Sequence, residues 1–224
     1  MKLWQEKKEV NSIMKYTLDL ELLSVQEYKA LLKQQNLLPG RRILWQDIEE
    51  NFAVFEGKGI KTVAQLKKNL STPAKMSDIE AASGISEEYL VILKREIGSL
   101  EQKPVPLSGF PGIDPSLLAK LGVVGLKTSK DYWESKQDFS DELFCLCDLV
   151  RINGVGPIAA RAFHEAGYRS ASDVAAADAA VMLERVAAVN ESRHYYKAKL
   201  GLKDMQFCID FALLLNKFDS NVRL

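Results

Sequence analysis

The stretch that decides the fold runs Leu149-Val150-Arg151-Ile152-Asn153-Gly154-Val155-Gly156-Pro157-Ile158-Ala159-Ala160-Arg161-Ala162-Phe163. One apolar stripe ends at Ile152 and another begins at Ala159, which is the spacing of two helices with a break between them. In the break, glycines permit a positive φ and a close approach of another chain segment. Pro157 suits the first turn of a helix, where no amide proton is needed. The stretch therefore predicts a helix, a tight turn and a second helix whose first amides point outward.

The order of these residues, apolar-x-Gly-apolar-Gly-x-x-x-Ala from Ile152 to Ala160, resembles the helix-hairpin-helix motif. The resemblance implies that the backbone amides of the turn hold a nucleic-acid phosphate without reading base sequence, as a helix N-terminus can. Many members of that family carry Lys and a hydroxyl residue just after the proline, whereas this chain has Ile158 and Ala159 there. The residues that we expect at a nucleic-acid contact are Gly154, Val155, Gly156, Ile158, Arg151, Arg161 and Arg169.

The charge of the chain limits the kind of nucleic-acid protein that it can be. Its 224 residues carry 30 basic and 30 acidic side chains, so the formal net charge is zero. A protein whose main work is coating DNA needs a strongly basic face. The balance therefore favours either a weak, local contact with nucleic acid or a contact with another protein.

The sequence holds no set of metal ligands or catalytic groups at a recognisable spacing. Cys145, Cys147 and Cys208 form no Cys-x-x-Cys pair, and only two histidines accompany them. Buried thiols in a reducing compartment explain such a set. The chain also lacks a phosphate-cradling glycine loop with lysine, a Ser/His/Asp spacing and a His-Glu-x-x-His motif. We therefore expect no metal, no cofactor and no enzymatic activity.

Nothing in the sequence indicates a membrane protein. The segment Met1–Val10 is polar and of mixed charge, and no apolar run is long enough to span a bilayer. We expect no membrane partner and a cytoplasmic location. The ordered pattern begins at Tyr16, so residues 1–15 are expected to form an N-terminal extension.

A seven-residue pattern occurs three times in the chain. It runs Gly, an apolar or aromatic residue, a base, Thr or Ser, two further residues, then Gln or Asp, in Gly59–Gln65, Gly125–Asp131 and Gly167–Asp173. The glycine is expected to end one helix, and the next residue to enter the core. The hydroxyl is expected to cap the following helix in a capping box with the Gln or Asp. Such a repeat predicts three related helical units.

Further cap signals and apolar spacings place the other helices. Ser24-Val25-Gln26-Glu27 reads as a capping box, and Gly84-Ile85-Ser86 reads as a break between two helices. The expected helices are 24–35, 41–56, a short one capped by Ser77, one after Ser86 with Leu90, Leu93 and Ile97 inward, 178–189 and 203–218.

A second candidate hairpin, Phe110–Ala119, differs from the first at the position that matters for anion binding. Asp114 stands where Gly156 stands in the first hairpin. A carboxylate there repels phosphate, but Asp before Pro115 is a good helix cap. We therefore expect this copy to be structural.

Two prolines suggest a boundary between domains. Pro104 and Pro106 interrupt every helical pattern between Glu101 and Gly109. We expect an N-terminal helical domain at 16–103 and a C-terminal helix-hairpin-helix domain at 107–224. The alternative is a stiff connector within one elongated helical body.

From Met14 onward, the pattern resembles a bacterial domain family of unknown function that is built from tandem helix-hairpin-helix units. The likeness lies in Tyr16–Leu20, Leu38–Leu44, Gly84–Ser86 and Gly154–Ala160. It implies an all-α fold of tandem helix-hairpin-helix modules and supplies no activity. The sequence thus favours a non-catalytic protein that binds DNA or other nucleic acid weakly through residues 154–158. A protein-interaction or scaffold role without nucleic-acid binding is the alternative.

Overall fold

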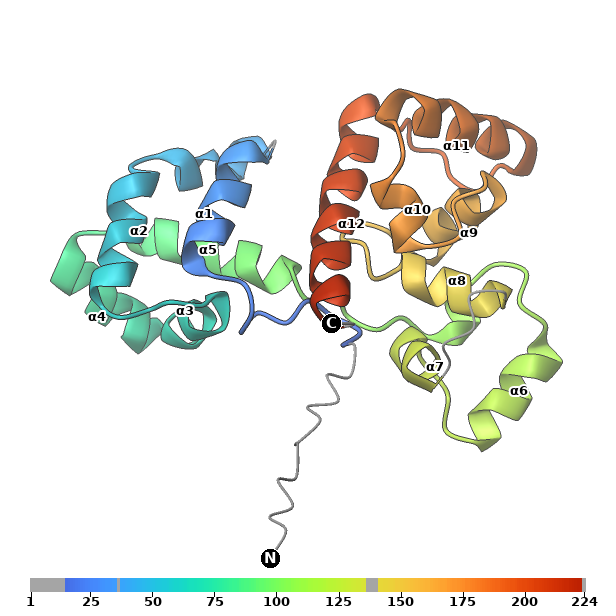
Figure 1. Cartoon of the computed structure of the whole chain (residues 1–224), viewed down its shortest axis with the longest axis horizontal. Coiled ribbons are helices and arrows are strands. Elements are labelled where there is room, and N and C mark those ends of the chain that lie inside the picture. The colour runs from blue at the N-terminus through green and yellow to red at the C-terminus, as the bar shows by residue number, and fades with distance from the viewer. Residues whose placement is uncertain (1–14, 36, 136–140, 223–224) are drawn as a thin grey trace, which may run out of the picture.

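The structure, a computed structural model, describes residues 15–35, 37–135 and 141–222, with the side chains of the last segment up to residue 219 (Figure 1). These residues form twelve α-helices and two short 3-10 helices. The described chain contains no named β-strand, only two isolated β-bridges. The expected all-α fold is confirmed. All but the last residue of the expected N-terminal extension lies outside the described residues.

The first half of the described chain forms one group of helices around a shared core (Figure 1). Aromatic and leucine side chains fill that core and are almost fully buried; they include Tyr28, Phe52, Phe55, Leu66, Leu90 and Leu93. The elements are α1 Val25–Gln34, η1 Pro39–Trp45, α2 Ile48–Gly57, α3 Val63–Asn69, α4 Pro73–Ser83 and α5 Glu87–Ser99.

The second half contains the hairpin turn and ends in the longest helix, which lies between the turn's helices and the first half (Figure 1). That last helix, α12 Leu202–Val222, packs along α10 and α11. The other elements are η2 Leu107–Gly109, α6 Pro115–Val123, α7 Ser129–Ser135, α8 Glu142–Leu149, α9 Pro157–Glu165, α10 Ala171–Ala175 and α11 Ala179–Arg193.

The three repeated segments fold as their sequence predicts, except that the capping box is complete at Thr62 and Thr128 but not at Ser170, where Asp173 accepts from the amide of Arg169 instead. Each begins with a glycine at positive φ, namely Gly59 at 76°, Gly125 at 85° and Gly167 at 95°. The hydroxyl then accepts a hydrogen bond from the amide three residues on, at 3.3, 3.3 and 3.0 Å for Thr62, Thr128 and Ser170. The plug residues Ile60 and Tyr168 are buried, whereas Leu126 is half-buried.

Two expectations about helices are wrong. The long helix expected over 41–56 is divided into η1 and α2, because Asp47 adopts the left-handed conformation at φ 48°. A short polar side chain tolerates that conformation, so apolar spacing alone does not reveal the break. Ser77 starts no helix but lies inside α4, which Thr72 caps with Pro73 at its first position. Ser77 carries the stronger sequence signal, with Glu80 three residues on, but Pro73 after Thr72 favours the first turn of a helix at that point.

A buried arginine ties the two halves of the chain together. Arg151, at the end of α8, is 2% exposed. Its Nε donates to the carbonyl of Tyr16 at 2.9 Å, and its Nη1 donates to Asp148 at 2.7 Å. Its Nη2 donates to both carboxylate oxygens of Asp219 at 2.9 Å, and the guanidinium lies 4.2 Å from the ring centre of Trp133. The segment before α1, residues 15–23, which we call the lead-in, therefore meets α7, α8 and α12 at one charge.

The lead-in and the segment that joins the two halves meet at one hydroxyl. We call that joining segment, residues 101–106 with Pro104 and Pro106, the proline connector. Ser129 is fully buried, and its Oγ lies 2.7 Å from the hydroxyl oxygen of Tyr16. The same Oγ accepts a hydrogen bond from the amide of Val105 at 3.0 Å. Burial raises the pKa of Tyr16 to about 12, so its hydroxyl keeps its proton. The lead-in and the proline connector are therefore fixed to the second half at the same point.

Replacing Arg151 should destabilise the whole protein. We expect Arg151→Met to lower the free energy of unfolding by about 3–5 kcal/mol, because the buried carboxylate of Asp148 and the half-buried carboxylate of Asp219 lose their counter-charge. Urea unfolding followed by circular dichroism measures the change. Arg169, which is exposed, is the matched control. Arg169→Met should change the free energy by less than about 0.5 kcal/mol, and equal losses in the two variants would contradict the assignment.

The ion pair between the halves should make stability sensitive to acid. Lys217 Nζ lies 2.5 Å from Glu27 Oε1. This ion pair, together with the capping-box hydrogen bonds that Glu27 makes with Ser24, lowers the pKa of Glu27 to about 2. A carboxyl group with a depressed pKa contributes stability above its unfolded pKa of about 4.3, and that contribution is lost as the pH falls. We expect Glu27→Gln to be less stable than wild type near neutral pH. Its thermal midpoint should decline less between about pH 5 and pH 2, and parallel declines would refute the coupling.

Candidate nucleic-acid interface

The turn between α8 and α9 has the glycine geometry of a hairpin, but its two glycines serve different purposes. Gly154 has φ 85°, whereas Gly156 has φ −87° and ψ 177°, which any residue adopts. A Cβ on Gly154 would lie 3.6 Å from the ring of Phe207, and a Cβ on Gly156 would meet nothing within 4 Å. Val155 between them is buried and anchors the turn in the core. Only Gly154 therefore depends on the conformational freedom of glycine.

The first amides of α9 face no side-chain acceptor in the described chain. Gly156 occupies the cap position and has no side chain to offer. Pro157 has no amide proton, and the first backbone bond runs from the amide of Ala160 to the carbonyl of Gly156 at 2.9 Å. The amides of Ile158 and Ala159 therefore stay open, as an anion site at a helix N-terminus requires.

The neighbouring helices show what a closed N-terminus looks like in this protein. Asp114 accepts from the amide of Ser116 at the start of α6, at 2.8 Å. Asp178 accepts from the amides of Ala180 and Val181 at the start of α11, at 2.9 and 3.0 Å. These carboxylates occupy the positions that a phosphate would take. The cap at Asp114 agrees with the expectation that the second hairpin, Phe110–Ala119, has a structural role.

Two of the three arginines expected near the phosphate do not lie at the surface. Arg151 is held in the buried cluster described above. Arg161 is 6% exposed; its Nε donates to the carbonyl of Pro111 at 2.9 Å and its Nη1 to Glu142 at 2.6 Å. Its Nη2 is buried without a hydrogen bond. The structure thus places the guanidinium groups of Arg151 and Arg161, both expected at a nucleic-acid contact, in the interior, where a buried guanidinium must remain with its internal acceptors.

The third arginine and the apolar rim of the turn are accessible. Arg169 is exposed; its backbone amide donates to Asp173 at 2.8 Å, and its side chain has no hydrogen bond within the described residues. Ile158 is 46% exposed and Phe207 is 37% exposed. The open amides thus lie in a rim that is mainly apolar.

The second hairpin docks against α9 rather than presenting its own turn. A Cβ on Gly109 would lie 3.5 Å from the side chain of Pro157, and one on Gly112 would lie 3.7 Å from Nη2 of Arg161. Arg161 therefore acts as a clamp between the loop at 109–112 and α9. Sequence reasoning could not find this clamp, since Arg161 and Pro111 are 50 residues apart.

The hairpin between α10 and α11 also escaped sequence reasoning. The turn at 176–178 carries no glycine, so the motif pattern does not mark it. Its usable signal is Asp178, which caps α11 just after three alanines.

The cysteines and the histidine beside the turn have the properties of buried groups. Burial raises the pKa of Cys145 to about 11 and that of Cys208 to about 12. Burial lowers the pKa of His164. Within the described ranges, no group of three His, Cys, Asp or Glu residues is placed to hold a metal ion. No helix in the same ranges has the length and apolar character that crossing a bilayer requires.

Comparison with known families identifies the segment around the turn. Residues 148–193 match the SAM-like helix-hairpin-helix tandem family. The matched segment begins at the end of α8, contains α9 and α10, and ends with α11. No curated protein and no solved structure matches the chain. The match supports a helix-hairpin-helix domain at residues 148–193, which include the turn before α9.

The two glycines of the turn should respond differently to alanine. We expect Gly154→Ala to lower the free energy of unfolding by about 1–2 kcal/mol, because alanine is strained at positive φ. Gly156→Ala should stay within about 0.5 kcal/mol of wild type, because a stiffer unfolded chain offsets a poorer helix cap. Chemical denaturation of both variants measures the difference. Equal losses would mean that the turn differs from the one described.

Proposed function

We propose that this protein binds nucleic acid weakly, without reading sequence, through the turn at 154–158, and that it performs no catalytic step. The single observation that supports this most is the open N-terminus of α9. The helices of the other two hairpins, α6 and α11, begin with an aspartate cap, and α9 begins with Gly156. The family match, which includes this turn, points the same way because helix-hairpin-helix domains often bind nucleic acid.

The proposed contact is one phosphate on the amides of Ile158 and Ala159. The dipole of α9 favours an anion at its N-terminus. Pro157 has no amide proton, so the first donors that an anion meets there are the amides of Ile158 and Ala159. Backbone donors recognise the phosphate and carry no information about the bases. Binding through them is therefore independent of sequence.

The buried arginines set the expected strength of this contact. With Arg151 and Arg161 held inside the protein, Arg169 is the arginine of the expected set that remains exposed. Non-specific binding of this kind has a dissociation constant of about 10⁻⁴ to 10⁻⁶ M at physiological salt. We place this protein at the weak end of that range, since few cationic side chains assist the amides.

Installing an aspartate cap tests the proposal without disturbing the fold. Gly156→Asp recreates the cap seen at Asp114 and Asp178, and a Cβ at Gly156 meets nothing within 4 Å. We expect stability to be unchanged or raised by up to about 1 kcal/mol. Binding to labelled oligonucleotides at low salt should weaken by about tenfold or more, because the carboxylate takes the amides and repels phosphate. Fluorescence anisotropy reads the binding.

The matched control is Gly156→Ala, which leaves the amides open. Its affinity for both single-stranded and duplex oligonucleotides should equal that of wild type. The proposal fails if Gly156→Asp binds as well as Gly156→Ala, or if wild type binds neither kind of oligonucleotide.

One observation favours the alternative of a protein-interaction role. Helix α6 has no fully buried residue, and apolar side chains at its end are unusually open, with Val123 88% and Val124 69% exposed. The equivalent positions before Gly59 and Gly167 hold Gly57-Lys58 and Glu165-Ala166. Exposed apolar residues that cluster often mark contact sites. A protein partner retained after nuclease treatment by wild type, and lost with Val123→Lys/Val124→Lys, would support this role.

A further inference from the structure

A group of lysines surrounds the turn between α3 and α4, far along the chain from the hairpin. Lys67 and Lys68 lie in the last turn of α3. Lys75 Nζ donates to the carbonyl of Lys68 at 2.9 Å and to Oγ of Ser71 at 3.1 Å. Lys94 Nζ, from α5, donates to the carbonyl of Ser71 at 2.8 Å. We call this group, Lys67, Lys68, Lys75 and Lys94 around Ser71, the lysine turn.

Most of the positive charge of the lysine turn is not neutralised. Lys67 pairs with Glu101. For Lys68, Lys75 and Lys94, no carboxylate of the described chain lies within ion-pair distance. Carbonyl and hydroxyl oxygens fix the position of an ammonium group without cancelling its charge, and the C-terminal dipole of α3 offsets only part of it. Two ammonium groups are thus held on one residue, Ser71, in a protein of zero net charge.

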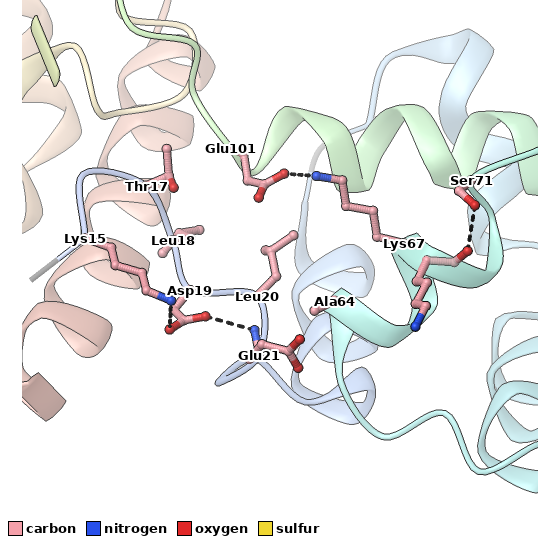
Figure 2. Close-up of a pocket in the computed structure, with 11 residues that line it drawn as sticks. Lys15, Thr17, Leu18, Asp19, Leu20, Glu21, Ala64, Lys67, Ser71 and Glu101 are labelled. Carbon is pink, nitrogen blue, oxygen red and sulfur yellow. Dashed lines mark hydrogen bonds and ion pairs between the residues drawn. The ribbon is translucent and has the colours of Figure 1, made fainter. Parts of the chain in front are cut away.

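A hollow of about 460 Å³ opens beside the lysine turn (Figure 2). Lys67, Lys68 and Ser71 line one side of it, and the lead-in segment around Asp19 lines the other. Two of its three carboxylates are paired with lysines, Asp19 with Lys15 and Glu101 with Lys67 (Figure 2).

The remaining charged groups of the hollow are one carboxylate, that of Glu21, and one ammonium group, that of Lys68. Glu21 accepts from the hydroxyl of Thr62 at 3.3 Å. Lys68 is the ionised group on this wall whose ammonium has no partner in the described chain. On the lysine turn itself, an incoming anion would therefore meet the free ammonium group of Lys68, with those of Lys75 and Lys94 fixed on the same turn, whereas the Glu21 carboxylate belongs to the lead-in.

We propose that the lysine turn is a second phosphate-contact surface for the nucleic acid bound at the hairpin. This inference rests on the proposed function and supplies what the hairpin lacks. Affinity for a polyanion comes largely from counterions released when lysine or arginine neutralises phosphates. At the hairpin, the side chains of Arg151 and Arg161 are buried. By contrast, Lys68, Lys75 and Lys94 keep their charge at or near the surface.

Removing these charges tests the assignment. The variant Lys68→Gln/Lys75→Gln/Lys94→Gln should bind a labelled single-stranded or duplex oligonucleotide at least about tenfold more weakly at about 50 mM salt. The slope of log affinity against log salt should become shallower by roughly two to three. The control Lys58→Gln/Lys61→Gln/Lys120→Gln removes the same charge from exposed lysines elsewhere and should bind nearly as wild type does.

The outcomes distinguish an effect of the lysine turn itself from an effect of the protein's net charge. Equal weakening in the two triple variants would overturn the proposal, since net charge alone would explain it. No weakening in the first variant would overturn it as well. If the first variant binds weakly and Gly156→Asp binds normally, the hairpin role fails while the lysine turn still contacts phosphate. Weakening in both would support both sites.

The substitutions also remove hydrogen bonds that hold α3, α4 and α5 together, so folding is checked with variants that separate structure from charge. Lys75→Arg/Lys94→Arg keeps the charge and should keep the affinity. Lys68→Glu touches no internal hydrogen bond and should weaken binding alone, with an unchanged thermal midpoint. Wild-type affinity in Lys68→Glu would contradict the proposal even if the triple variant failed to fold.

Discussion

The buried guanidinium of Arg151 is the constraint on which the rest of the structure depends. A charge taken out of water must be paired and hydrogen-bonded, and here its acceptors come from the lead-in, α8 and α12. Asp148 extends the network, because it also accepts from the indole of Trp133 at 2.9 Å and from the first amide of α10, at Ala171, at 2.7 Å. The orientation of α10 relative to α8 therefore follows from one carboxylate. The hairpin turn follows directly after Arg151, so the same hydrogen bonds also fix its position.

The same constraint shapes the proposed function. Arg151 and Arg161 serve the interior, so the hairpin is left with backbone donors and a largely apolar rim at Ile158 and Phe207. A contact of that composition recognises a phosphate and little else. The lysine turn would then contribute charge from the other half of the chain. Because Ser129 and Lys217 hold the halves together, the two surfaces would keep a defined separation rather than act as independent modules.

Local chemistry explains which parts of this structure the sequence could predict. The capping boxes of Thr62 and Thr128, and the caps at Ser170 and Asp114, involve residues within four positions of each other, and they form as expected. The fate of an arginine depends instead on distant acceptors. Arg151 and Asp219 are 68 residues apart, and Arg161 and Glu142 are 19 apart. No local sequence pattern therefore predicts that the two arginines are buried. The sequence also does not reveal the backbone conformation of Gly156, because a glycine at a motif position need not have a positive φ.

The most direct test of the account is an amide-resolved NMR titration with a short oligonucleotide at low salt. We predict that the largest shifts occur at the backbone amides of Ile158 and Ala159, and that the side-chain Nε signal of Arg151 stays unchanged inside its network. Shifts confined to other helix N-termini, such as those of α6 and α11, would contradict the claim that α9 alone among the three hairpin helices is open to phosphate.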